Sequence, residues 1–126
     1  MIQLHYRNAL INRLTDQGLS FYETSMPDSS AKYPFIFVPD AVANEGAIKS
    51  GRTGTLTQTL HVWSDQPHRR GDCYRLVERV VQICTRIHEA GPYGLMLVDK
   101  QIRPMTDDTT ATPFLHVVVE LTYNFS

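Results

Sequence analysis

The chain has 126 residues, a mass of 14.3 kDa and a formal net charge of −1 at neutral pH. This length is typical of one domain, and a hydrophobic content of 42% is enough for an apolar core, so we expect a single domain over residues 1–126. Basic and acidic residues nearly balance. This argues against a dedicated nucleic-acid-binding protein, because such proteins carry an excess of Lys and Arg.

We expect neither a membrane segment nor a disulfide. The longest purely apolar run, 35–38, is far too short to cross a bilayer, and residues 1–7 lack the apolar stretch of a signal peptide. Cys73 and Cys84 fall on one predicted helix, where their separation along the axis is about 16.5 Å, too far for a disulfide. The chain is therefore expected to be a reduced, intracellular protein.

The first third of the chain predicts a helix and two strands. Residues 2–14 have the apolar period of a helix and are followed by Gly18, a typical residue just past a helix end. The apolar side of this helix is expected to consist of Leu4, Leu10, Ile11 and Leu14. A short strand is expected over 18–24, and a strand that is apolar on both faces over 33–38.

The middle of the chain predicts a connection, a strand and a long helix. Residues 40–53 contain two glycines and no aromatic residue, so a long flexible connection is expected there. Residues 54–64 alternate strictly between apolar and polar side chains, as in a strand with one buried face. A helix is expected from Pro67 to Ala90, before the stop at Gly91, with apolar residues over half its circumference.

Two further strands are expected over 94–103 and 114–125, joined by a polar linker over 106–112. The fold class is therefore α+β, with the order α-β-β-β-α-β-β. We expect an antiparallel-rich sheet of four to five strands. The N-terminal helix and one long amphipathic helix pack on it.

Searching for chemistry gives no constellation of catalytic, metal-binding or cofactor-binding residues. The glycine-rich segment 51–54 lacks the Gly-Lys-Ser/Thr of a phosphate-binding loop. Cys84 and His88 share a predicted helix face, but two ligands do not make a structural zinc site. His61 and His116 lie on predicted strands that could bring them together, a structural arrangement more often than a catalytic one. The chain is thus expected not to be an enzyme and to need no cofactor.

Three features are candidates for contact with a partner. Trp63 lies on the second face of its strand, where it either packs under a loop or the N-terminal helix or serves as an interface anchor. Three arginines of the long helix cluster within about 40° of its polar arc, either as a solvated face or as a contact surface. The tentative interface residues are Trp63, Arg75, Arg79 and Arg86, with Asn44, Glu45, Lys49 and Arg52 in the flexible connection.

An ordered series of features runs through most of the chain. An N-terminal helix precedes a Pro-containing strand over 33–38, and a long loop leads to a strand that ends in Trp63-Ser64. An amphipathic helix over 71–90, a polar hairpin loop at 105–108 and a terminal strand over 116–125 follow. This series resembles the small tail-completion proteins of long-tailed bacteriophages, the tail-terminator or head–tail joining family. The strand with its Trp-Ser end, followed by the helix, is its most specific part.

The resemblance implies that the chain acts by self-association. Such proteins form a ring, typically of six copies, on the finished end of the tail tube, where they stop growth and join the head connector. The implied partners are the chain itself, the tail-tube protein and a connector or stopper protein; DNA only passes through the lumen, and no membrane is involved. The implied location is the host cytoplasm during assembly and then the virion.

Two alternatives stay open. One is another neck or tail component, such as a connector stopper. The other is an unrelated α+β module or enzyme that acts on a small ligand.

Overall fold

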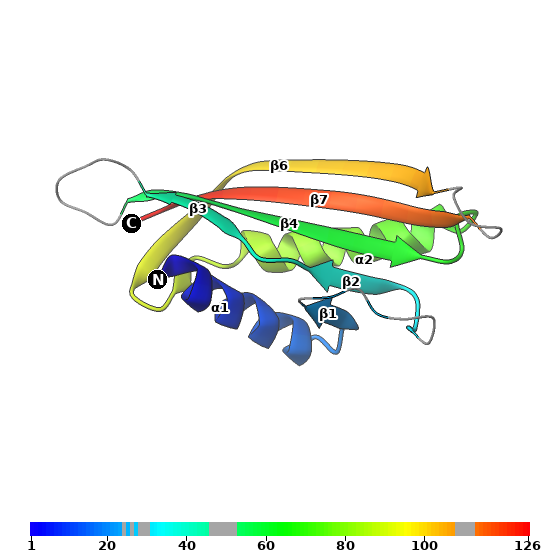
Figure 1. Cartoon of the computed structure of the whole chain (residues 1–126), viewed down its shortest axis with the longest axis horizontal. Helices are drawn as coiled ribbons and strands as arrows, with labels where there is room; N and C mark the ends of the chain where they lie inside the picture. Colours follow the sequence, from blue (N-terminus) through cyan, green and yellow to red (C-terminus); the bar gives the residue numbers. More distant parts are fainter. Residues whose placement is uncertain (24, 26, 28–30, 46–52, 108–112) are drawn as a thin grey trace.

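The computed structural model describes residues 1–23, 25, 27, 31–45, 53–107 and 113–126, which form two helices and a sheet of seven strands. The elements are α1 (Ile2–Asp16), β1 (Phe21–Glu23), β2 (Phe35–Val38), β3 (Val42–Glu45), β4 (Gly54–Ser64), α2 (Arg70–Thr85), β5 (Glu89–Ala90), β6 (Tyr93–Asp107) and β7 (Phe114–Phe125). The strand order is β1-β2-β4-β7-β6-β5, with β3 beside β4 (Figure 1). The α+β class is confirmed. The sheet exceeds the predicted four to five strands because β3 and β5 were not predicted.

The antiparallel pair β4–β7 forms the middle of the sheet. Every residue of β4 is opposite a residue of β7, from Gly54 against Phe125 to Ser64 against Leu115. The predicted bounds of both strands, 54–64 and 114–125, are confirmed. Long alternating runs predict such strands well because one face must be apolar for the strand to be buried on that side.

The two faces of the sheet differ in how they are covered. Side chains such as Leu60 and Val62 of β4 and Val117 of β7 point toward the helices and belong to the apolar core; we call this the inner face. The opposite side, the outer face, carries His61 and Trp63, which are half-buried.

The helix α1 begins and ends close to its predicted bounds but turns a different side to the core. Its buried residues follow each other at intervals of four: Ile2, Tyr6, Leu10 and Leu14. The expectation that Leu4 is buried is wrong, since its side chain is 52% exposed. Tyr6 is buried in the core instead of Leu4. A prediction based on aliphatic residues alone does not include this tyrosine.

The helix α2 is shorter than predicted. It begins at Arg70 and ends at Thr85, whereas the apolar pattern predicted 67–90. Ile87 and Ala90 are buried as in a continuing helix, but they lie on the connection to β5 and in β5 itself. Gly91 then adopts a positive φ of 57° and allows the tight turn into β6. The predicted helix was too long because these two apolar residues continue the helical pattern, although their backbone is not helical.

The predicted flexible connection over 40–53 contains a strand. Val42–Glu45 form β3 and pair with residues 54–57 of β4, so the prediction is wrong for this segment, and residues 46–52 lie outside the described residues. Backbone hydrogen bonds hold β3, while Val42, Asn44 and Glu45 are exposed, so side-chain composition did not reveal it. Similarly, β6 continues to Asp107, past its predicted end at 103.

A chain of buried hydroxyl groups joins three elements. The Tyr6 hydroxyl of α1 donates to the Tyr123 hydroxyl of β7 at 2.9 Å, and Tyr123 donates to the backbone carbonyl of Cys84 at 2.8 Å. Cys84 lies in the last turn of α2, and its carbonyl also accepts a hydrogen bond from the backbone N–H of Ile87 at 3.2 Å. Burial raises the pKa of both tyrosines well above the ordinary value, so the hydroxyls stay protonated and able to donate.

Replacing Tyr123 with Phe should destabilise the fold by about 1–3 kcal/mol, because it leaves the Tyr6 hydroxyl without an acceptor and removes one of the donors to the Cys84 carbonyl. Tyr6→Phe should cost less, about 1 kcal/mol, since Tyr123 still donates to Cys84. Urea denaturation followed by circular dichroism measures both. The matched control is Tyr74→Phe, at a partly exposed tyrosine of α2, which should change the free energy of unfolding by less than about 0.5 kcal/mol. Equal effects at all three positions would contradict this account.

Candidate functional site

The predicted arginine cluster of α2 divides into two parts. Arg75 forms an ion pair with Asp72 of the same helix, and Asp72 also pairs with Arg69 at 2.9 Å. Arg79 instead reaches α1, where it donates to the backbone carbonyl of Gln17 at 3.5 Å and to its side-chain Oε1 at 3.4 Å. Arg86 is the residue just past the last turn of α2, and its side chain has no hydrogen bond or ion pair among the described residues.

A second helix adds a further arginine to this region. Arg13 of α1 lies with Arg79 and Arg86 around a hollow of about 240 Å³ between the C-terminal parts of the two helices. We call these three arginines the basic patch. One carboxylate, Asp16, borders the same hollow, so positive charge is in excess there. Sequence analysis missed Arg13 because it lies on another helix.

The other predicted interface residues are spread over the molecule. Asn44 and Glu45 are exposed on β3, opposite Thr55 and Gly54. Lys49 and Arg52 lie outside the described residues. The structure therefore brings Arg79 and Arg86 together but does not join them with the residues of β3, which line neither side of the basic patch.

Trp63 takes part in an aromatic cluster on the outer face of the sheet. Its ring stacks on the imidazole of His116, with centroids 3.9 Å apart and planes inclined by 9°, and it meets Phe114 edge-on. Its Nε1 atom is buried and has no hydrogen-bond partner among the described residues. Trp63 thus packs against side chains of β7, on the face of the sheet away from α1, and its role as an interface anchor stays a prediction.

The two strand histidines face each other, as their positions allowed. Nδ1 of His61 and Nε2 of His116 are 2.7 Å apart, and the rings stack with centroids 4.9 Å apart. One imidazole donates the shared proton to the other, so the contact requires that at least one ring be neutral. Burial lowers the pKa of both histidines, and for His116 the positive charge of His61 lowers it further.

Strand β6 presents apolar side chains to solvent along much of its length. Residues 98–106 are all exposed, and they include Val98 (48% exposed), Ile102 (45%) and Met105 (44%). Val98 is the extra residue of a β-bulge, since Leu97 and Asp99 are opposite neighbouring residues of β7. An exposed apolar strand at the side of a sheet is a typical surface for pairing with another chain.

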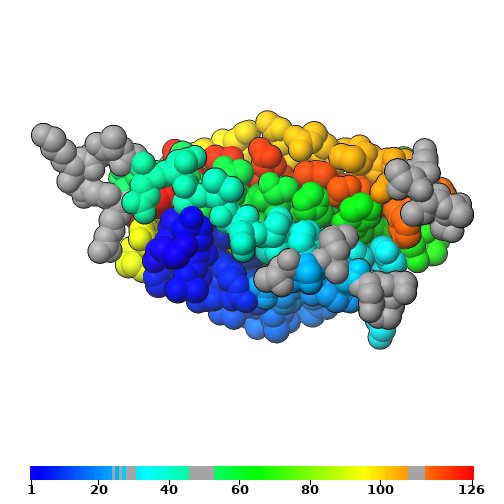
Figure 2. All heavy atoms as spheres, in the orientation of Figure 1, coloured from blue at the N-terminus to red at the C-terminus, as the bar shows by residue number. Residues whose placement is uncertain are grey.

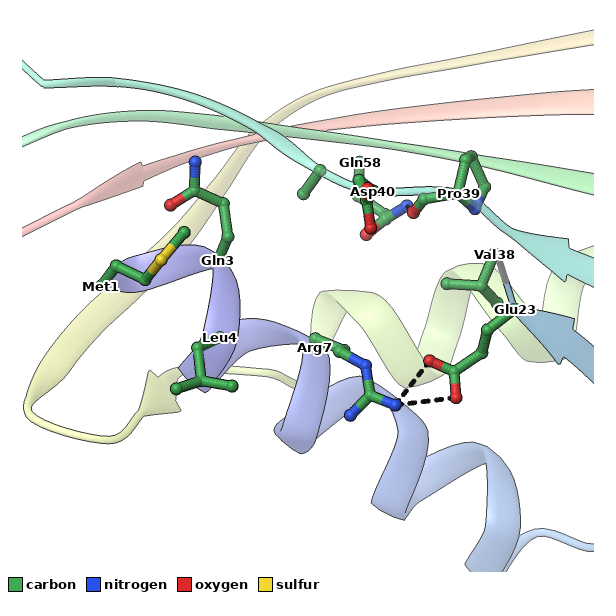
Figure 3. Close-up of a pocket in the computed structure, with 10 residues that line it drawn as sticks. Met1, Gln3, Leu4, Arg7, Glu23, Val38, Pro39, Asp40 and Gln58 are labelled. Carbon is green, nitrogen blue, oxygen red and sulfur yellow. Dashed lines mark hydrogen bonds and ion pairs between the residues drawn. The ribbon is translucent and has the colours of Figure 1, made fainter. Parts of the chain in front are cut away.

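A pocket of about 430 Å³ lies between α1 and the segment that joins β2 to β3 (Figure 3). Leu4 and Val38 form part of its wall, and Gln58 and Asp40 contribute polar groups. Figure 2 shows the surfaces of α1 and of β2 and β3 meeting on this side of the molecule. Sequence analysis missed this pocket. The signal was a glutamine at an inner-face position of β4, where Leu56, Leu60 and Val62 are its apolar counterparts.

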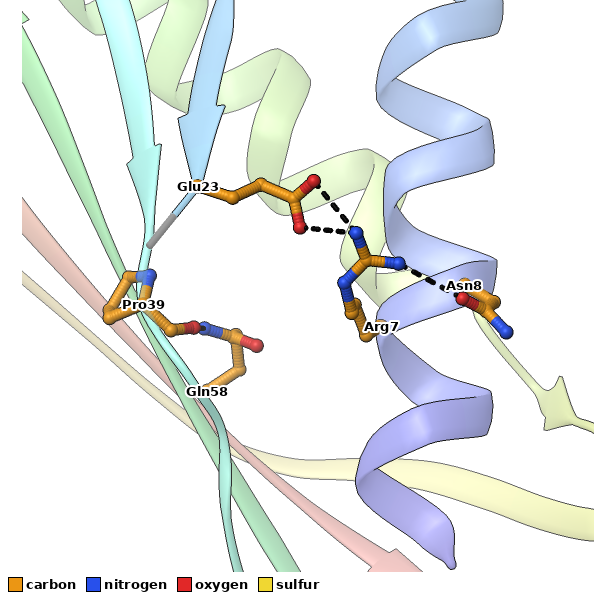
Figure 4. Close-up of polar contacts among 5 residues, drawn as sticks. All are labelled: Arg7, Asn8, Glu23, Pro39 and Gln58. Carbon is orange, nitrogen blue, oxygen red and sulfur yellow. Dashed lines mark hydrogen bonds and ion pairs between the residues drawn. The ribbon is translucent and has the colours of Figure 1, made fainter. Parts of the chain in front are cut away.

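One ion pair closes the pocket on the side of β1. Nη2 of Arg7 lies 2.8 Å from Oε1 and 2.7 Å from Oε2 of Glu23, and Nη1 of Arg7 donates to the side-chain oxygen of Asn8 at 3.1 Å (Figure 4). The pair links α1 to β1. Because the Arg7 side chain is half exposed, the pair contributes little to stability and mainly fixes the positions of the two groups.

No metal centre is found in the described part of the chain, where no three His, Cys, Asp or Glu side chains converge. The prediction that Cys84 and His88 share a helix face is wrong, because α2 ends at Thr85 and His88 lies beyond it. Within the same residues, neither helix is long and apolar enough to cross a bilayer.

No family model and no curated protein matches the chain. Among solved structures, the chain is similar to a chain from the virion of a native gene transfer agent particle. Their sequences are 10% identical, the TM-score is 0.67, and the match covers 94% of this chain and 92% of that chain. The two chains therefore share a fold over nearly their full lengths.

The histidine pair should make the fold less stable in mild acid. Each histidine binds a proton more weakly in the folded than in the unfolded chain. The free energy of unfolding should therefore fall as pH drops from about 7 to 5, and the histidines' contribution to it should be fully present above their pKa in the unfolded chain. Urea denaturation at several pH values measures this slope for the wild type and for His116→Gln. The variant should have a smaller slope. The control His68→Gln, at an exposed histidine, should keep it, and an unchanged slope in His116→Gln would contradict the prediction.

Proposed function

We propose that the chain is a structural protein of a phage-like virion. The observation that carries this proposal is the fold shared with a chain of a gene transfer agent virion, at a TM-score of 0.67 over nearly all of both chains. The resemblance of the ordered elements to tail-completion proteins points to the same class independently. A strand that ends in Trp63-Ser64 and a following amphipathic helix are both present, as β4 and α2.

Within this class we propose the tail-completion role. Copies of the chain form a ring on the end of the tail tube and join it to the head connector. The exposed apolar residues of β6 support a protein that works by contact with other chains. The near-neutral charge suits protein partners better than a grip on DNA. The role needs shape and self-association and no catalysis.

Deletion of the gene tests the role directly. Electron microscopy of the resulting particles should show filled heads and separate tails, with tails of abnormal length or uncapped ends. Joined particles with tails of normal length would contradict the tail-completion role. Filled heads that leak DNA beside tails of normal length would instead favour a connector stopper.

Charged substitutions on β6 should separate folding from assembly. Val98 and Ile102 are both nearly half exposed, so Val98→Asp with Ile102→Asp should change the free energy of unfolding by less than about 1 kcal/mol. If these side chains contact another chain, the double variant should fail to complement the deletion, because a carboxylate is then buried without a partner. The matched control is Gln101→Asp, an exposed polar position on the same strand. Full complementation by the double variant would remove β6 from the proposed interface.

A further inference from the structure

The pocket beside α1 contains a hydrogen-bond acceptor, Oε1 of Gln58, that no donor among the described residues reaches. Gln58 is 2% exposed, and its Nε2 atom donates to the backbone carbonyls of Pro39 at 2.9 Å and Thr59 at 2.8 Å. Both amide hydrogens are thereby used, and Oε1 has no hydrogen-bond partner among the described residues. Figure 4 shows this oxygen on the side of the amide away from Pro39, facing the space beside Arg7 and Glu23. Because this oxygen lines the pocket and keeps its accepting capacity, a group that enters the pocket with an N–H donor can form a hydrogen bond there.

The rest of the pocket specifies what carries that donor. Asp40 borders it with an exposed carboxylate that has no ion pair among the described residues. Leu4 and Val38 supply apolar wall beside these polar groups (Figure 3). Arg7 is already engaged by Glu23, so it does not neutralise Asp40. A long aliphatic stem with a cationic, multiply donating head matches this combination, and arginine has both.

The same chain carries arginines without matching anions on another part of its surface. The basic patch of Arg13, Arg79 and Arg86 has one neighbouring carboxylate, Asp16, and the guanidinium of Arg86 makes no polar contact among the described residues. The pocket uses the first turns of α1 against the strands, whereas the basic patch uses its last turn against α2. The two surfaces therefore lie at opposite ends of α1.

We propose that the pocket beside α1 receives an arginine of the basic patch, Arg86, from a second copy of this chain. Its guanidinium donates to Gln58 Oε1 and pairs with Asp40, while its stem packs on Leu4 and Val38. Because pocket and patch are different surfaces of one chain, the contact is head-to-tail, and repetition of such a contact closes a ring when the rotation permits. This inference rests on the proposed ring assembly and names the contact that forms it.

Self-association of the purified chain tests the contact without any virion. In sedimentation velocity, the wild type should associate, and salt should weaken the association because exposed charges contribute. Asp40→Arg and the pair Arg79→Glu with Arg86→Glu should each raise the dissociation constant by roughly 10- to 100-fold, since each places like charges opposite one another. An equimolar mixture of the two variants should associate again, because one keeps an intact patch and the other an intact pocket.

Matched charge reversals outside the two surfaces serve as controls. Arg75→Glu, on the same helix but outside the basic patch, and Asp65→Arg, at an exposed position, should leave association unchanged. Thermal melting of every variant should match the wild type, so that loss of association does not reflect loss of folding. Asp40→Asn should weaken association less than Asp40→Arg, since it removes one charge pair and adds no repulsion.

Several outcomes would overturn the proposal. These are a wild type that stays monomeric up to about 1 mM, association that survives both reversals, and a mixture of the two variants that does not associate. If Asp40→Arg spares association but abolishes complementation of the gene deletion, another virion protein occupies the pocket and the proposed contact between copies is wrong. The role in tail completion is judged separately by the deletion itself, so failure of this contact leaves that test intact.

Discussion

Two tyrosine hydroxyls in an apolar core determine where the first helix lies. A buried hydroxyl must be hydrogen-bonded, and Tyr6 and Tyr123 meet this need only in series, with the Cys84 carbonyl at the end. These two hydrogen bonds can form together only when α1, β7 and the last turn of α2 are in the observed arrangement. Tyr6 and Tyr123 also meet edge-on, with ring centroids 5.1 Å apart, so a rotation of α1 would break packing and hydrogen bonding together.

The position of α1 in turn determines both surfaces at its ends. The pocket is bordered by Leu4 and Arg7, and the basic patch includes Arg13, so each side chain depends on the rotation of the same helix. The Arg7–Glu23 pair is too exposed to hold α1 by itself. The apolar residues at intervals of four, with Tyr6 among them, therefore position the polar groups that face outward.

Local patterns predicted the central strands and failed where tertiary contacts decide. Residues 54–64 and 114–125 alternate without interruption, and their strands were predicted at the observed bounds. The end of α2 was not, because Ile87 and Ala90 are as apolar and buried in the connection and in β5 as they would be in a helix. β3 was not predicted either, since backbone pairing with β4 stabilises it and its side chains are mostly exposed.

In the candidate site, too, local sequence patterns predicted some features, and tertiary contacts determined the others. A helical wheel placed Arg75, Arg79 and Arg86 together. Arg75 pairs with Asp72 of its own helix, whereas the position of Arg13 beside Arg79 and Arg86 depends on packing between the two helices. The sequence shows Gln58 as a polar residue among the apolar inner-face residues of its strand. What it faces depends on Pro39 and on α1, which are distant in sequence, so its role could not be derived from its own strand.

The positions of the two cysteines determine how their thiols react with labelling reagents. Both Cys73 and Cys84 are free and buried in α2, and burial raises the pKa of both thiols, that of Cys84 to about 12. Because the thiolate is the reactive form, alkylating reagents and oxidants meet almost none of it near neutral pH. A single cysteine introduced at an exposed position should therefore react with a fluorophore or cross-linker much faster than either natural cysteine.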